Sequence, residues 1–189
     1  MKKWIGFTLF GLVLLAGCTG DQRSPLDTSI YNQTNDKIGT ASLKETPDGV
    51  EMTLKVEGLE PGVHAVHIHE FPECEAPDFK SSGNHFNPKA KDHGLMNTEG
   101  AHAGDMQNVE ADASGLVDAK VMLPEAKLKE GQMSLLRKEG TSIVITDGQD
   151  DGMTQPAGNS GDRIACGKIT LNADKDEASD PTEPDKKQE

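Results

Sequence analysis

The 189-residue chain has the length of one ordinary domain with tails, and its 34% hydrophobic content can supply one core but hardly two. Its formal net charge of −13 argues against nucleic acid as a partner. We therefore expect a single acidic domain.

The first residues have the layout of an export signal. Lys2 and Lys3 precede an apolar run from Trp4 to Ala16, which is too short to span a bilayer comfortably. The run leads into Leu15-Ala16-Gly17-Cys18, which resembles the bacterial lipobox, where the cysteine becomes the acylated first residue. We expect a signal peptide at residues 1–17 and an exported protein anchored through Cys18 to the cell membrane, facing outside the cytoplasm. An ordinary cleaved signal with a chance cysteine is the alternative.

Residues 18–36 are polar and rich in Ser, Thr and Asp, which predicts a tether that merges into a first strand near Ser29 to Gln33. With Cys18 assigned to the lipid, Cys74 and Cys166 remain as an even pair in an oxidising compartment. They are predicted to form one disulfide, and two unrelated buried thiols are the alternative.

Apolar and polar residues alternate through much of the following chain. Val50, Met52, Leu54 and Val56 are separated by polar residues, and residues 117–123 repeat the two-residue period. Further short runs bounded by turn residues are expected as strands at 38–43, 63–69, 133–136, 142–146 and 164–171. No stretch after Pro25 has a convincing helical period. The fold class predicted is all-β, a sandwich or flattened barrel of about eight antiparallel strands with long metal-binding loops.

All six histidines lie between Gly62 and Asp105. His67 and His69 are separated by one residue, so in an extended strand their imidazoles share a face about 7 Å apart. The remaining part of the segment is rich in Gly, Pro, Asn and Asp and predicts a long functional loop. His64 lies an odd number of residues from His67 and His69, so we leave it out of the metal set. The spacings suit two adjacent metal ions.

Several stretches together resemble the copper,zinc superoxide dismutase family, most closely its bacterial exported branch. They are GVHAVHIHEF at 62–71, GNHFNP at 83–88, His93-Gly94, HAGD at 102–105, and GNSGD at 158–162 followed by RIACG at 163–167. The resemblance covers about Ile38 to Leu171 and implies a Greek-key β-sandwich domain at residues 37–172.

The resemblance also implies the roles of individual residues. The expected copper ligands are His67, His69 and His85, and the expected zinc ligands are His85, His93, His102 and Asp105. Three imidazoles and one carboxylate also satisfy a closed tetrahedral zinc site on chemical grounds alone. Asp150 matches the carboxylate that links copper and zinc ligands, Arg163 matches the anion-guiding arginine, and the family disulfide maps onto Cys74 and Cys166.

The activity that the resemblance implies converts superoxide to oxygen and hydrogen peroxide, with His85 and Arg163 as catalytic residues. Copper alternates between two oxidation states while the His85 bridge is protonated and released. One position departs from the family: Thr146 stands where its fourth copper histidine lies, and a neutral hydroxyl is a poor copper ligand. Copper then keeps three histidines at most, with water or Asp147 as the remaining ligand.

The segment 147–162 is a second departure, since it has four aspartates and no lysine or arginine, so that only Arg163 offsets its negative charge. Two functions stay open: a working dismutase, or a non-enzymatic lipoprotein that keeps zinc and the disulfide for stability and binds copper weakly. The remaining residues, 173–189, are charged, have no aliphatic or aromatic side chain larger than alanine except proline, and are expected to be disordered.

Overall fold

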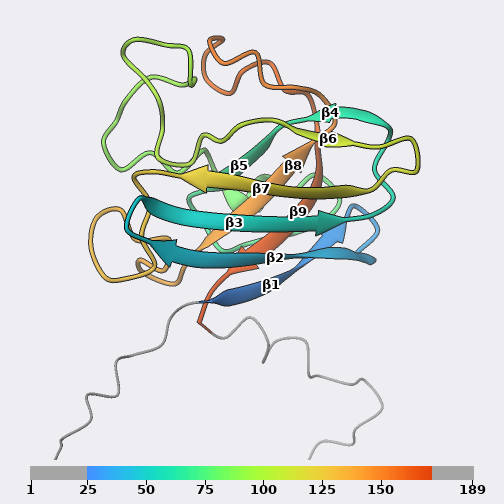
Figure 1. The fold of residues 1–189 in the computed structure, drawn as a ribbon, viewed down its shortest axis with the longest axis horizontal. Coiled ribbons are helices and arrows are strands. Elements are labelled where there is room, and N and C mark those ends of the chain that lie inside the picture. The colour runs from blue at the N-terminus through green and yellow to red at the C-terminus, as the bar shows by residue number, and fades with distance from the viewer. Residues whose placement is uncertain (1–24, 172–189) are drawn as a thin grey trace, which may run out of the picture.

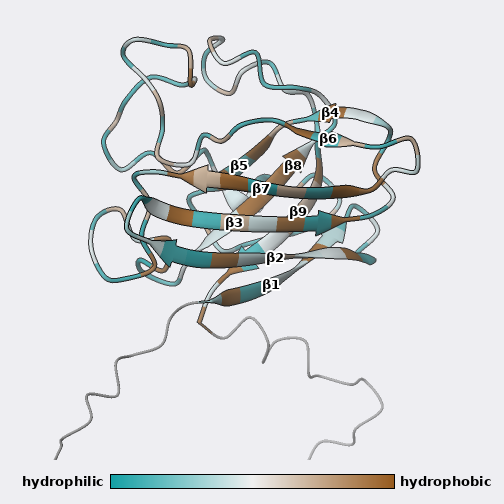
Figure 2. Cartoon of the chain, in the orientation of Figure 1, coloured by the Kyte–Doolittle hydropathy of each residue, from teal (hydrophilic) through white to brown (hydrophobic). Residues whose placement is uncertain are grey.

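The computed structural model describes residues 25–171. In it, the residues that alternate between apolar and polar form the strands of the sheet that carries the candidate site. Val50, Met52, Leu54 and Val56 are fully buried, whereas the residues between them are partly or fully exposed. Figure 2 shows this alternation as brown and teal bands along the front strands. One face of each such strand therefore packs on the core while the other meets water.

Nine strands and one short 3₁₀ helix make up the described part of the chain. They are β1 (Leu26–Asn32), β2 (Lys37–Thr46), β3 (Gly49–Val56), β4 (Gly62–His64), β5 (Val66–His69), η1 (Lys80–Ser82), β6 (Val109–Ala111), β7 (Val117–Leu123), β8 (Thr141–Thr146) and β9 (Arg163–Ile169). Seven strands form an antiparallel sheet in the order β5-β8-β9-β1-β2-β3-β7, and β4 pairs with β6.

The seven-stranded sheet folds over on itself to enclose the core. In Figure 1, β1, β2, β3 and β7 form a front layer, and β5, β8 and β9 cross behind it. One buried cluster joins Leu43 and Leu54 of the front layer to Ile143 and Ile145 of the back layer. The predicted all-β antiparallel fold is confirmed.

Strand β8 is buried along its whole length because both of its faces are covered. Ile143 and Ile145 face the main core, whereas Val144 packs with Phe79 and Cys166 in a second cluster. The chain that follows β5 thus lies over the outer face of β8 and β9. It is held there by the Cys74–Cys166 disulfide, which confirms the predicted pair and joins residues 92 positions apart.

Two sequence-based predictions of local structure need correction, and one strand was missed. Residues 133–136 are not a regular strand: Ser134 N closes a turn with Gly131 O, a single isolated bridge pairs Ser134 with Lys127, and Leu135 is buried in the main core. The strand expected at 63–69 is interrupted at Ala65 and belongs to two sheets. The short strand β6 was not predicted, since three residues are too few for a periodic pattern to show.

The domain also begins earlier than the sequence indicated. β1 starts at Leu26 and pairs with both β2 and β9, so the predicted tether of 18–36 includes a strand of the main sheet. Ile30 of β1 is buried in the core, so the first strand expected near Ser29 to Gln33 belongs to the folded domain and lies before residue 37. The expected signal peptide at 1–17, the expected lipid site Cys18 and the expected tail at 173–189 lie outside the described residues. Within residues 25–171, no helix has the length and hydropathy needed to cross a membrane.

Candidate metal centre

The edge strand β5 carries the first two histidines of the site. His67 and His69 are buried, and both rings lie against His85, with ring centroids 3.9 and 5.1 Å apart respectively. The two imidazoles thus share one side of the strand, as the two-residue spacing predicts.

The long loop after β5 returns twice along the free edge of this strand. Phe86 N donates to Ile68 O at 2.8 Å, and Ile68 N donates to Gly104 O at 2.9 Å. Gly104 fits this approach because a Cβ there would collide with the carbonyl oxygen of Ile68. These bonds bring His85 and Asp105 beside β5, although they are distant in sequence.

Four side chains from the loop meet around the Asp105 carboxylate. His85 Nδ1 lies 2.9 Å and His102 Nδ1 lies 3.2 Å from Oδ1, and His93 Nδ1 lies 3.1 Å from Oδ2. One ligand atom of each of the four residues lies within 4.8 Å of those of the other three. The expected zinc set is therefore brought together, and its three nitrogens and one oxygen are the donors that tetrahedral zinc prefers.

Backbone groups fix the direction of the Asp105 carboxylate. Its Oδ2 accepts hydrogen bonds from Gly94 N at 2.9 Å and from His102 N at 3.0 Å. Although burial alone would raise its pKa, hydrogen bonds from the surrounding histidines hold the pKa of Asp105 well below its usual range. Asp105 therefore stays an anion, ready to bind a cation.

The protonation of the histidines differs across the site. Burial lowers the pKa of His85 to about 4, against the opposing effect of Asp105, and burial also holds the pKa of His69 well below 6.5. For His93, burial is outweighed by bonds to Asp105 and Asp150, and its pKa rises to about 9. His85 and His69 are thus neutral near pH 7, as metal ligation requires.

Asp150 connects the two groups of histidines. Its Oδ2 lies 2.8 Å from His67 Nε2, and its Oδ1 lies 3.1 Å from His93 Nε2. Asn108 holds this carboxylate in place, because Asp150 N donates to Asn108 Oδ1 and Asn108 Nδ2 donates to Asp150 O, both at 2.9 Å. The sequence analysis identified Asp150 but missed Asn108, which no local pattern distinguishes from other loop asparagines.

The second candidate metal position is defined by nitrogen atoms without partners. Because Nε2 of His67 faces Asp150, its Nδ1 carries the lone pair, and this buried atom has no hydrogen-bond partner. In His69 the two nitrogens have the opposite roles: Nδ1 lies 2.9 Å from Gly83 O, and the buried Nε2 has no hydrogen-bond partner. Two buried orphan lone pairs beside His85 fit a copper ion, for which imidazole is a suitable ligand.

Thr146 lies at the end of β8, next to these histidines but with its hydroxyl directed elsewhere. Its Oγ1 donates to Gly148 O at 3.2 Å, and a register irregularity separates it from Ile145. Asp147 is exposed, and its Oδ1 accepts a hydrogen bond from Asp162 N at 2.8 Å. Asp147 therefore does not join the histidines, and three imidazoles remain.

His64 lies apart from the metal positions. Its Nδ1 is 2.8 Å from Thr146 O, and its Nε2 is 2.8 Å from Glu60 O. Both nitrogens are occupied by backbone carbonyls, which agrees with leaving it out of the ligand set.

Arg163 is fixed at the start of β9. Its guanidinium donates to Phe79 O at 2.9 Å, Ser82 Oγ at 3.0 Å and Gly83 O at 2.9 Å. These acceptors lie in the segment that the disulfide fastens to β9, so the disulfide also positions the arginine.

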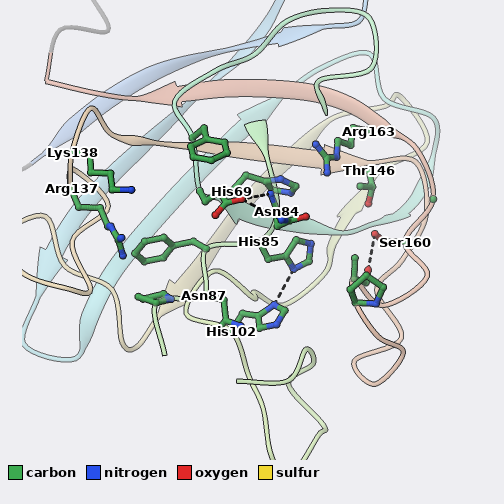
Figure 3. A pocket seen from close by; sticks show the side chains of 17 residues that line it. His69, Asn84, His85, Asn87, His102, Arg137, Lys138, Thr146, Ser160 and Arg163 are labelled. Atoms are coloured by element: carbon green, nitrogen blue, oxygen red, sulfur yellow. Dashed lines mark hydrogen bonds between the residues drawn. The ribbon is translucent and has the colours of Figure 1, made fainter. Parts of the chain in front are cut away.

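A pocket of about 540 Å³ opens over the histidines (Figure 3). His69, His85 and His102 line it together with Thr146 and Arg163. In Figure 3, Arg163 and Thr146 lie on one side of His85 while Arg137 and Lys138 lie on the opposite side. A small solute can therefore reach the candidate copper position from solvent.

Comparisons with known proteins agree with this geometry. The family model described as copper/zinc superoxide dismutase (SODC) matches residues 37–169. The chain is 46% identical over 171 residues to "Superoxide dismutase [Cu-Zn] 2" of Aquifex aeolicus (strain VF5), covering 89% of this chain and 99% of that one. It is 38% identical over 149 residues to "Superoxide dismutase-like protein YojM" of Bacillus subtilis (strain 168), covering 77% and 76% of the two chains.

Solved structures give the same result. A SOD-like protein from Bacillus subtilis superimposes with a TM-score of 0.74 at 36% identity, covering 76% of this chain and 97% of that one. The Cu/Zn superoxide dismutase from Brucella abortus has a TM-score of 0.66 at 28% identity, covering 77% and 99%.

Proposed function

Because the chain belongs to the copper/zinc superoxide dismutase family, we propose that it converts superoxide to oxygen and hydrogen peroxide at a copper ion held beside a zinc ion. The family implies copper and zinc as cofactors. The observation that carries the proposal is the pair of buried, unpartnered atoms His67 Nδ1 and His69 Nε2 beside His85. A histidine cluster kept only for stability would not leave two buried lone pairs without hydrogen-bond partners.

In this proposal His67, His69 and His85 hold copper, and His85, His93, His102 and Asp105 hold zinc. Copper, when bound, would supply one-electron exchange, so that one superoxide is oxidised to oxygen and a second is reduced, with uptake of two protons that come in the end from water, to hydrogen peroxide. His85 is the shared residue, because Nδ1 belongs to the Asp105 cluster and Nε2 remains to take and release a proton.

The other residues act on position and charge. Asp150 keeps His67 in the tautomer that presents Nδ1, which fixes the ring for ligation. The forked guanidinium of Arg163, whose backbone acceptors hold it rigid, presents donors to a small anion at the pocket floor.

A second candidate function is a weak or inactive dismutase-like lipoprotein with structural zinc. Thr146 favours it, because its hydroxyl is engaged with Gly148 O and Asp147 is turned away. Three imidazoles suit Cu(I) better than Cu(II), which prefers a tetragonal set. The likeness to proteins named superoxide dismutase-like is consistent with this alternative.

The deciding experiment measures superoxide decay with the copper- and zinc-loaded protein and determines both metals on the same sample. We expect decay to accelerate in proportion to bound copper. The controls are the zinc-only protein and His67→Gln, which removes one of the orphan nitrogens. Full copper occupancy without acceleration would reject the enzyme in favour of the second function.

We also propose that the protein is exported and held on the membrane through a lipid on Cys18. Acylation supplies the hydrophobic attachment, so Cys18→Ser is expected to move the protein from the membrane fraction to the soluble fraction. Thr19→Ser, which keeps the cysteine, is the matched control. A Cys18→Ser protein that stays wholly membrane-bound would refute the anchor.

A further inference from the structure

Two cations line the pocket from a part of the chain that carried no functional prediction. Arg137 and Lys138 belong to the irregular segment between β7 and β8, and both lie on the pocket wall (Figure 3). The segment 147–162, where the sequence led us to look for steering charge, has no lysine or arginine. The positive charge at the pocket therefore comes from Arg137 and Lys138, in the segment between β7 and β8, and not from the segment 147–162.

The position of Arg137 is fixed by the loop after β5. Its guanidinium lies 5.7 Å from the centroid of the Phe86 ring, within cation–π distance, and its Nη1 donates to Gln132 O at 3.3 Å. Gln132 in turn donates to Pro88 O at 2.9 Å. The segment is thus attached to the residues next to His85, the shared ligand of the proposed centre.

Lys138 follows directly, with a positive φ of 55°. This left-handed conformation is uncommon for a residue other than glycine. In Figure 3 the Lys138 side chain lies beside Arg137 on the same side of the pocket. Two adjacent residues in the sequence thereby contribute both of their charges to one wall.

The charge balance in the pocket favours anions. Arg137, Lys138 and Arg163 all line it, and within residues 25–171 none of the three has a carboxylate at ion-pair distance. Glu70 is the acidic residue among the lining residues, and its Oε1 accepts hydrogen bonds from Asn84. The pocket is locally positive in a protein whose formal charge is −13.

The carboxylates of three of the four aspartates in the segment 147–162 are engaged in hydrogen bonds. Asp147 accepts a bond from Asp162 N, Asp151 accepts bonds from the backbone of Met153 and Thr154, and Asp150 is buried against the histidines. None of the four aspartates lines the pocket. The carboxylates of this segment are therefore not part of the pocket wall, although Asp150 lies against the buried histidines.

We propose that Arg137 and Lys138 form an electropositive entrance that draws small inorganic anions toward Arg163 and the histidines. For superoxide as the anion this rests on the proposed function, but attraction of an anion is a property of the pocket itself. Clefts lined with one sign of charge raise the local concentration of the opposite ion and the association rate. Arg137 and Lys138 thus supply the positive charge for steering anions that the segment 147–162 lacks.

Binding of inorganic phosphate to the zinc-loaded full chain tests the entrance without redox chemistry. Phosphate is titrated at low ionic strength, and the backbone amide signals of Asn84 and Gly161, both on the pocket wall, are followed by NMR. The double variant Arg137→Gln/Lys138→Gln is expected to bind phosphate roughly tenfold more weakly. That value corresponds to a factor of about two to four for each charge acting on the anion through ~10 Å of water.

Lys127→Gln is the matched control, since Lys127 is exposed in the same segment but does not line the pocket. It is expected to bind phosphate like the parent, and the deficit of the double variant should shrink as added salt shortens the screening length. Equal phosphate binding by the double variant and Lys127→Gln would overturn the proposal.

A parallel measurement separates this inference from the proposed function. In the copper-loaded protein the double variant should lower kcat/KM for superoxide, which carries a single negative charge, by roughly fourfold at low salt and leave kcat unchanged. If no variant consumes superoxide but phosphate binding still depends on Arg137 and Lys138, the dismutase proposal fails and the anion entrance stands.

Discussion

In the proposed copper site, Thr146 occupies the position where a fourth imidazole would complete the ligand set. It sits at the pocket beside His69 and His85, yet its hydroxyl is bonded to Gly148 O. A histidine on the same backbone would instead reach toward the three imidazoles, because β8 pairs directly with β5, which carries two of them.

We predict that Thr146→His raises Cu(II) affinity by at least tenfold and raises dismutation per bound copper, since a fourth imidazole completes a tetragonal set. Competition with a chromophoric chelator measures the affinity. Thr146→Val, which keeps the shape and loses the hydroxyl, should bind copper as the parent does. A histidine variant no tighter than the valine variant would show that the end of β8 lies farther from the copper position than we infer.

His93 governs how zinc binding responds to pH. Bonds to Asp105 and Asp150 outweigh burial and raise its pKa to about 9, above the ~6.5 of an unfolded chain, so the metal-free protein carries this proton at pH 7.5. Zinc needs the Nδ1 lone pair and must displace the proton.

Zinc binding at pH 7.5 should therefore release about one proton, and the apparent affinity should increase up to tenfold per pH unit until about pH 9. Titration calorimetry in buffers of different ionisation enthalpy measures the release. In the metal-free state the raised pKa stabilises the fold fully below pH 6.5, and this contribution is lost as pH rises to 9. Asp150→Asn removes a negative charge that favours protonated His93 and should reduce the proton release; heats independent of buffer would contradict the assignment.

At the scale of elements, the segment that covers the outer face of β8 and β9 contributes both to the stability of the fold and to the position of Arg163. The Cys74–Cys166 bond fixes it, and Phe79 packs under it against Val144. The same segment supplies the carbonyl oxygens of Phe79 and Gly83 that hold Arg163.

Cys74→Ala is expected to lower the free energy of unfolding of the zinc-loaded protein by about 4–5 kcal/mol, the chain-entropy value for a loop of this length. Urea denaturation measures the loss, and the parent treated with a reductant serves as the matched comparison. Weaker phosphate binding should accompany it, since Arg163 loses its fixed acceptors. An unchanged urea midpoint would mean that packing alone holds the segment.

At the scale of the whole molecule, the proposed zinc site would hold together the long segment between β5 and β6, which has little regular secondary structure. Between the end of β5 at His69 and the start of β6 at Val109, the chain has only the short helix η1, and four candidate ligands lie in that span. Binding energy at a site absent from the unfolded chain is folding energy.

Zinc at 1,000 times its Kd should stabilise the parent by about 4 kcal/mol and raise Tm by roughly 10 °C. His102→Ala is expected to lose most of this increase, while both proteins should melt close together in the presence of a chelator. Calorimetry with and without zinc measures the effect. An equal zinc response in the two proteins would remove His102 from the ligand set.

The sequence by itself determined the features that depend on neighbours along the chain. The alternation in residues 50–56 predicted which side chains of that strand face the core. The single residue between His67 and His69 predicted that both rings lie on one side of a strand. The all-β class and the cysteine pair were also predictable, because alternation and an even cysteine count do not require knowledge of distant contacts.

The tertiary structure alone decided features that depend on contacts between distant segments. The Thr146 hydroxyl turns to Gly148, Asp147 bonds to Asp162, and the apolar run 133–136 is buried as turns rather than as a strand. The charge of the pocket is the clearest case, since Arg137 reaches it only because Gln132 and Phe86 hold its segment beside the metal loop. A side chain's direction is set by the partners that folding brings to it, and these partners lie many residues away in the sequence.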